Sequence, residues 1–313
     1  MLQRCLAVLF ALLGMSGALA FDLQGHRGAR GLAPENTLPA FQLALDLGVD
    51  TIECDTAITR DGIVVIHHDL QLNPDTTRGP DGKWLDRPGP LIRELSFEEL
   101  QQYDVGRIRP GSEYARTFPQ QKPVDGTRIP RLSDLFDLVK RSGHTRVNFD
   151  CETKLSPLER AATLPVDDFT RRVIAEVRKA GMERRMTIQS FDWSSLQLVQ
   201  EEAPEIRTMY LSSPRTLAPT GDGRPSPWLA GFSPEAHGGS VPRAVRAAGG
   251  KIWAPNQTFL TPAMLAEARA LGLTVIPWTV NEPNMIAKLL DMGVDGILSD
   301  RPDLVQAELR KRR

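Results

Sequence analysis

Short apolar segments alternate along the chain with longer segments in which apolar residues recur at helical spacing. The short segments predict nine strands, at residues 22–26, 49–55, 63–67, 146–152, 186–189, 207–211, 251–254, 273–278 and 296–298. The longer segments predict helices at 38–47, 132–142, 167–179, 193–201, 262–270, 283–291 and 302–311. This alternation indicates βαβ units and a parallel sheet. About eight such units predict an α/β fold with a closed (β/α)8 barrel, which leaves one strand outside it.

Two long segments interrupt the alternation. Residues 70–128 are rich in Gly, Pro and charge, with one helical stretch at 96–103, and residues 212–239 form a second loop rich in Pro, Gly and Ser. Connections of this length are usually functional or disordered. The first follows His68 and Asp69 directly, so we expect it to form a cap at the end of the third strand.

The first twenty residues have the pattern of a secretory signal peptide. Arg4 precedes an apolar run at 6–13, and the small residues at 18–20 suit cleavage after Ala20. An uncleaved anchor is the alternative, but the run is shorter than the roughly 20 residues of a membrane span. We therefore expect a periplasmic or secreted protein whose barrel domain comprises residues 21–313, without stable membrane insertion.

The charge of the chain is nearly balanced, with 38 Lys and Arg against 39 Asp and Glu. A nucleic-acid-binding surface would require a basic stripe, so nucleic acid is not an expected partner. The oligomeric state is left open.

Acidic residues gather where two predicted strands end. Because side chains alternate along a strand, Glu53 and Asp55 share one face, as do Asp150 and Glu152. At the carboxyl end of a barrel strand this face is the interior mouth, where active sites form. Buried acids need a partner, and oxygen ligands favour Ca²⁺ or Mg²⁺. Lys154 is placed to contact an anionic substrate. The alternative is an ordinary acid–base pair at the end of the strand.

The same alternation turns Cys54 and Cys151 away from the mouth. With the third strand expected between theirs, the two residues would lie about 10 Å apart. A disulfide requires Cα atoms within about 7 Å, so two buried free thiols are predicted.

Two of the five histidines, His26 and His68, close the first and third predicted strands. Two imidazoles at one mouth can serve as base and acid in the same reaction. Arg27 adds a planar guanidinium group, whose N–H donors suit phosphate oxygens. Glu35 lies in a segment that reads equally well as a helix start. Other strand-end residues that can line the pocket are Gln189, Phe191 and Trp278.

In their order and spacing these motifs resemble the glycerophosphodiester phosphodiesterases, in particular exported, periplasmic-type members. The resemblance covers nearly the whole chain after residue 20. It rests on His26-Arg27-Gly28, Pro34-Glu35-Asn36-Thr37, Glu53-x-Asp55, His68-Asp69, Glu152-x-Lys154, Ser190-Phe191, Trp278-Thr279-Val280-Asn281 and residues 293–297. The segment at 70–128 is similar to the cap insertion of the exported members.

The resemblance implies a distorted barrel and metal-dependent hydrolysis of glycerophosphodiesters to sn-glycerol 3-phosphate and an alcohol. It assigns the divalent metal, Ca²⁺ or Mg²⁺, to Glu53, Asp55 and Glu152. It assigns acid–base catalysis to His26 and His68. It assigns phosphate binding to Arg27 and Lys154 and adds Glu35 to the pocket. The family usually has Asn where this chain has Asp150, which bears on metal preference.

Two other functions fit the same motifs. A lysophospholipase D or phospholipase C-like enzyme would act on lipid, but it would need an apolar rim, and residues 70–128 are mostly polar. A non-catalytic phosphodiester-binding protein would lack one of the chemical groups, and none is missing.

Overall fold

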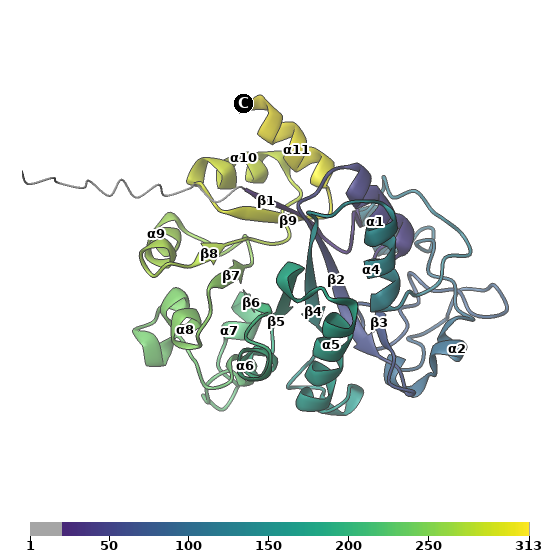
Figure 1. Cartoon of the computed structure of the whole chain (residues 1–313), viewed down its shortest axis with the longest axis horizontal. Coiled ribbons are helices and arrows are strands. Elements are labelled where there is room, and N and C mark those ends of the chain that lie inside the picture. The colour runs from purple at the N-terminus through teal and green to yellow at the C-terminus, as the bar shows by residue number, and fades with distance from the viewer. Residues whose placement is uncertain (1–20, 313) are drawn as a thin grey trace, which may run out of the picture.

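The computed structural model describes residues 21–312, and its centre is a ring of eight parallel strands. Helices surround this ring, and the first and last strands lie side by side (Figure 1). The strands, in chain order, are β1 (Asp22–Gly25), β2 (Thr51–Ile58), β4 (Asn148–Thr153), β5 (Met186–Ser190), β6 (Arg207–Ser212), β7 (Ile252–Pro255), β8 (Thr274–Val275) and β9 (Gly296–Ser299). The predicted (β/α)8 barrel is confirmed.

The ring runs β8-β7-β6-β5-β4-β2-β1-β9, and backbone hydrogen bonds bring its two ends together. The Asp295 N–H donates to the Val275 carbonyl at 3.0 Å, and the Leu298 N–H donates to the Pro277 carbonyl at 3.1 Å. β8 is shorter than the predicted 273–278, because Pro277 has no N–H to donate to a ladder.

The ninth strand, β3 (Val64–Ile66), is the one outside the barrel. It returns antiparallel along β2, pairing Thr56 with Ile66 and Ile58 with Val64. Because β3 takes no place in the ring, β2 and β4 are direct neighbours. The predicted cap does follow the third strand, but that strand forms a hairpin with β2 and does not belong to the barrel.

The outer helices bury apolar faces against the ring, and their ends carry recognisable signals. Thr37 caps α1 by accepting a hydrogen bond from the Ala40 N–H, and Gly181 ends α5 at φ 67°. Seven residues form α8, too few for a clear period, and it was not among the predicted helices. The helices are α1 (Leu38–Asp46), α4 (Leu132–Arg141), α5 (Val166–Ala180), α6 (Trp193–Glu202), α8 (Val241–Ala247), α9 (Pro262–Ala270), α10 (Pro283–Met292) and α11 (Pro302–Lys311).

The cap between β3 and α4 is ordered around an apolar cluster of its own. Leu72, Ile92, Leu100 and Ile129 pack there with Val65 of β3, which anchors the cap to the hairpin. Its regular elements are a 3₁₀ turn (Ile92–Glu94), α2 (Phe97–Leu100) and α3 (Glu113–Thr117). The loop after β6 contains α7 (Pro214–Leu217) and two 3₁₀ turns, Pro227–Leu229 and Glu235–His237.

Within residues 21–312, no helix combines the length and the apolar character that crossing a membrane requires. The predicted signal peptide lies outside the described residues.

Candidate active site

The loop after β1 is folded tightly against α1. Arg27 has φ 49° and Gly28 has φ 82°, both in the left-handed region. A Cβ atom at Gly28 would lie 2.7 Å from the Ala40 carbonyl carbon, so only glycine fits there. The turn aims the Arg27 N–H at Glu53, whose Oε2 accepts it at 2.7 Å. The loop and the acidic strand β2 are therefore held as one unit.

Three carboxylates meet inside the barrel mouth. β2 supplies Glu53 and Asp55, and β4 supplies Glu152, which is the register partner of Asp55. One oxygen from each can be chosen so that all three lie within 4.8 Å of one another, and all three residues are buried. Asp55 Oδ1 has no hydrogen-bond partner among the described residues. Such a cluster of hard oxygen donors can bind a divalent cation.

The three carboxyl groups differ in pKa because their surroundings differ. Burial, reinforced by the charges of Asp55 and Asp150, raises the pKa of Glu53 well above its usual range. Burial also raises the pKa of Glu152 to about 7, although the ammonium of Lys154 opposes the shift. For Asp55, burial is outweighed by Arg27, His68 and Lys154, and its pKa falls well below the usual range. Without a cation the cluster therefore retains protons near neutral pH.

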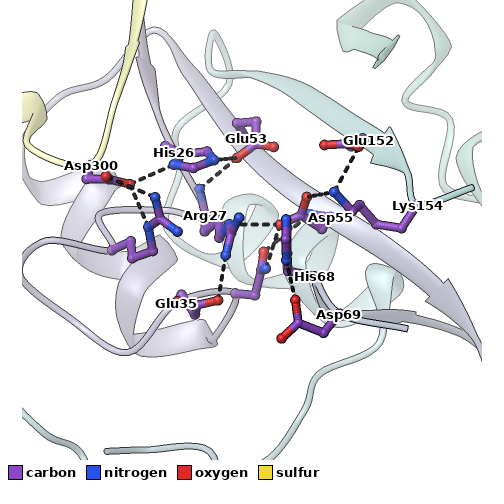
Figure 2. Close-up of polar contacts among 12 residues, drawn as sticks. His26, Arg27, Glu35, Glu53, Asp55, His68, Asp69, Glu152, Lys154 and Asp300 are labelled. Carbon is purple, nitrogen blue, oxygen red and sulfur yellow. Dashed lines mark hydrogen bonds and ion pairs between the residues drawn. The ribbon is translucent and has the colours of Figure 1, made fainter. Parts of the chain in front are cut away.

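His26 is oriented by a buried carboxylate from the other end of the chain. Its Nδ1 lies 2.6 Å from Asp300 Oδ1, and its Nε2 lies 4.0 Å from Glu53 Oε2 (Figure 2). Arg30 donates to both oxygens of Asp300, at 2.7 and 3.0 Å. Because the Asp300 carboxylate accepts the Nδ1–H, the Nε2 lone pair faces the acidic cluster. Burial and the charge of Arg30 lower the pKa of His26 to about 4.

His68 reaches the same mouth by another route. β3 runs back along β2, and the His67 N–H donates to the Asp55 carbonyl at 2.9 Å, which brings the next residue beside the cluster. His68 Nδ1 lies 2.6 Å from Asp69 Oδ1, so it also has a carboxylate partner. Burial and the charges of Arg27 and Lys154 lower the pKa of His68 to about 4. Both imidazoles are therefore neutral at pH 7.

Two cations flank the acids. Arg27 Nε lies 3.1 Å from Asp55 Oδ2, and Arg27 Nη1 donates to Glu35 Oε1 at 2.7 Å. Lys154 Nζ donates to Glu152 Oε1 at 2.9 Å and lies 3.7 Å from Asp55 Oδ1. Figure 2 shows these two cations on opposite sides of Asp55. The mouth thus offers positive charge on both sides of the acidic cluster to an anionic ligand.

The cap docks onto this site through α3. The Tyr114 hydroxyl donates to Glu35 Oε2, and Arg30 lies over the ring of Phe118 at 4.6 Å. Gln121 Nε2 donates to the Arg30 carbonyl at 2.7 Å. The cap therefore holds Glu35, which in turn holds Arg27.

Replacing Tyr114 with phenylalanine removes one hydrogen bond to Glu35. Because Glu35 accepts a hydrogen bond from Arg27, the position of the Arg27 side chain should become less restricted. We expect KM for a phosphodiester to rise about 3–10-fold with a smaller change in kcat. Steady-state kinetics would measure this. Tyr103→Phe is the matched control, because Tyr103 packs against the apolar cluster of the cap. Equal KM values for both variants would show that the Tyr114 contact positions nothing.

A cavity of about 750 Å³ opens beside His68 and Glu152. Phe191 contacts Trp278 and Trp228 edge-on, with ring centroids 5.3 and 6.3 Å apart. Residues along its wall include His68, Glu152, Lys154, Phe191, Trp228 and Trp278. A cavity of similar volume at the opposite end of the barrel is lined by strand starts such as Asp22 and Thr274. Only the first adjoins His68 and Glu152.

Two other candidates from the sequence lie close to the acids in different settings. Gln189 Nε2 donates to Glu53 Oε1 at 2.9 Å. Asp150 is fully buried, and neither of its carboxylate oxygens has a hydrogen-bond partner in the described part of the chain. It lies outside the group of three acids that meet at the mouth, and burial raises its pKa well above the usual range.

Sequence reasoning missed several residues of this site. Asp300 directly follows β9, so the rule applied to the other strand ends would have indicated it. Asn36 donates to Asp55 Oδ2 at 2.8 Å, although its segment was interpreted mainly as a helix start. No local signal marked Arg30 or Tyr114, because their partners are distant in sequence.

The sequence model that describes the glycerophosphoryl diester phosphodiesterase family matches residues 26–304 of this chain. A glycerophosphodiester phosphodiesterase from Caldanaerobacter subterraneus is 26% identical, over 91% of this chain and 96% of its own. A solved structure from Silicibacter pomeroyi, provisionally named a glycerophosphoryl diester phosphodiesterase, is 36% identical with a TM-score of 0.83, covering 94% of both chains. An Oleispira antarctica phosphodiesterase shares the fold, with 23% identity and a TM-score of 0.67, covering 92% of this chain and 96% of its own. The chain belongs to the glycerophosphoryl diester phosphodiesterase family.

Proposed function

We propose that the chain hydrolyses glycerophosphodiesters to sn-glycerol 3-phosphate and an alcohol in a metal-dependent reaction, with His26 and His68 as the acid–base pair. The observation that carries this is the meeting of two carboxylate-paired imidazoles with three buried acids at one mouth. The Oleispira antarctica enzyme of the same fold was solved with the product sn-glycerol-3-phosphate. We expect the same product here.

Glu53, Asp55 and Glu152 would hold the metal. The donor set fits a hard cation. Asp55 Oδ1 accepts no hydrogen bond from residues 21–312, and burial raises the pKa of Glu152 to about 7 even beside the ammonium of Lys154, so a further positive charge would stabilise the ionised cluster. When bound, a divalent cation supplies charge stabilisation at a phosphoryl oxygen and lowers the pKa of a coordinated hydroxyl. Ca²⁺ and Mg²⁺ are the expected ions.

The histidines would move the protons. One would remove the proton of the attacking oxygen through Nε2. The other would protonate the leaving alcohol, so it must enter the reaction as an imidazolium with a proton on Nε2, a form that the negative charge of a bound phosphodiester favours. In each, the Nδ1–H donates to a carboxylate, Asp300 for His26 and Asp69 for His68. These carboxylates keep the rings in the required tautomer and stabilise the imidazolium that forms.

Arg27 and Lys154 would bind the phosphoryl group. Glu35 accepts a hydrogen bond from Nη1 of Arg27 and Asp55 pairs with Nε, while Nη2 donates no hydrogen bond to residues 21–312. That nitrogen is therefore available to a phosphate oxygen. Charge stabilisation of this kind is usually a large contribution to catalysis.

The decisive assay measures sn-glycerol 3-phosphate released from glycerophosphocholine, with lysophosphatidylcholine as the lipid comparison and with EDTA as a separate arm. We expect release from glycerophosphocholine that EDTA abolishes and added Ca²⁺ or Mg²⁺ restores. Faster turnover of lysophosphatidylcholine would favour action on lipid. Binding of glycerophosphocholine without turnover would indicate a non-catalytic protein.

Metal binding should weaken at acidic pH. A carboxyl must lose its proton to bind a cation, and the pKa of Glu152 is raised to about 7. This group is mostly ionised at pH 8 and mostly protonated at pH 6, so Kd for Ca²⁺ or Mg²⁺ should be at least about tenfold higher at pH 6. The raised pKa of Glu53 acts in the same direction. The two imidazoles, with pKa values near 4, stay neutral across this window. Calorimetric titration at both pH values measures the difference, and equal Kd values would contradict it.

A further inference from the structure

We propose that Cys54 and Cys151 are the site of an intramolecular disulfide that clamps β2 to β4 behind the acidic cluster. The two residues are direct register partners in the parallel ladder. Both are free thiols in the structure, and their Sγ atoms lie 3.0 Å apart. The predicted separation of about 10 Å is wrong, because β3 pairs outside the ring and no strand intervenes between β2 and β4.

The spacing of the two strands suits the bond. Neighbouring strands lie about 4.8 Å apart, inside the range of about 4.4–6.8 Å between Cα atoms that disulfides span. The register pairs β2 with β4 continuously from Thr51 and Asn148 to Thr56 and Thr153. Joining the two sulfurs therefore requires the Sγ atoms to move from 3.0 Å apart to the roughly 2.05 Å of a disulfide bond.

The position of the pair matters for the site. Cys54 stands between Glu53 and Asp55, and Cys151 directly precedes Glu152. Alternation turns the acids inward and the thiols outward, into the apolar layer beneath the helices. A bond between the sulfurs would tie together the two strands that supply all three acids, without occupying the mouth.

Bond formation requires an oxidant, and a disulfide reagent or a dithiol–disulfide oxidoreductase is the class that fits. One cysteine thiolate attacks the oxidant's disulfide and releases one thiol. The second cysteine then attacks the mixed disulfide, forms the Cys54–Cys151 bond and releases the second thiol. Both protein thiols lose a proton, and two electrons reduce the oxidant. The oxidising compartment expected for an exported chain contains such reagents.

The burial of both cysteines determines at which stage of folding the disulfide can form. Both cysteines are fully buried, at 0% exposure, so a reagent cannot reach them in the closed barrel. The bond should form while the chain folds, before the helices cover the outer face of β2 and β4. Folded, reduced protein should then resist both oxidation and alkylation.

The test refolds the full-length chain from denaturant in a mixture of oxidised and reduced glutathione. The product is then unfolded in denaturant that contains N-ethylmaleimide, so that buried thiols are also alkylated, and its tryptic peptides are mapped. Cleavage after Arg and Lys places Cys54 in peptide 31–60, Cys151 in peptide 147–154 and Cys5 in a third peptide. We expect peptides 31–60 and 147–154 to be recovered as one linked species that dithiothreitol separates. Their recovery as two alkylated peptides would overturn the proposal.

Thermal unfolding tests the clamp itself. The bond would close a loop of nearly a hundred residues, so the oxidised protein should melt about 5–10 °C above the same protein in dithiothreitol. A Cys54→Ala, Cys151→Ala double variant should lose this dependence on reductant, while Cys5→Ser should keep it. Equal melting temperatures for the linked protein and for protein refolded in dithiothreitol, which lacks the bond, would overturn the strand clamp.

Discussion

Replacing His26 or His68 with alanine is expected to lower kcat for glycerophosphocholine by about 10²–10⁴-fold, because each variant removes a group that we propose transfers a proton in the reaction. Neither imidazole belongs to the apolar core, so circular dichroism should show an intact fold. Initial rates of sn-glycerol 3-phosphate release measure the effect.

His144→Ala is the control for these variants. His144 follows α4 near the starts of the strands, at the end of the barrel away from the mouth, and should turn over substrate like the unmodified protein. Turnover within tenfold of the unmodified protein for His26→Ala or His68→Ala would reject the role of that histidine.

Replacing Glu53 or Glu152 with glutamine should remove both metal binding and activity. Each change deletes one charge from the three carboxylates proposed to hold the metal, so we expect at least a tenfold higher Kd for Ca²⁺ or Mg²⁺ and a loss in kcat of about 10³-fold. Metal-dependent stabilisation in thermal unfolding reads out binding independently of turnover.

Asp150→Asn is the matched control for the acids. Asp150 is the register partner of Glu53 and is fully buried, yet it lies outside the group of three carboxylates that meet at the mouth. Because the amide keeps its shape and removes an unpartnered acid, we expect metal binding within a few-fold of the unmodified protein. A loss of binding as large as that of Glu152→Gln would make Asp150 a metal ligand and contradict the assignment of three.

The barrel was predictable because its signal is local. Strand and helix periodicity recurs in each βα unit, and an error in one boundary does not disturb the next. The two errors in the predicted elements, the missed α8 and the overlong β8, also have local causes. α8 is too short to show a period, and Pro277 shortens β8 by removing a hydrogen-bond donor.

The site was predictable in part for the same reason. Alternation along β2 and β4 places Glu53, Asp55 and Glu152 on the inner face whatever the neighbouring strands are. His26 follows from its position at the end of β1. His68 was expected at the end of a barrel strand. It reaches the mouth instead from β3, which returns antiparallel along β2 and is not part of the ring.

The sequence by itself determined the barrel, the inward direction of the acids and the outward direction of Cys54 and Cys151, since these depend on dihedral periodicity within single elements. Only the tertiary structure decided which elements are neighbours. It set the two sulfurs 3.0 Å apart, brought Asp300 to His26 across 274 residues and docked Tyr114 on Glu35. Strand order and cap docking depend on contacts between distant segments, and the residues on either side of such a contact carry no local trace of it.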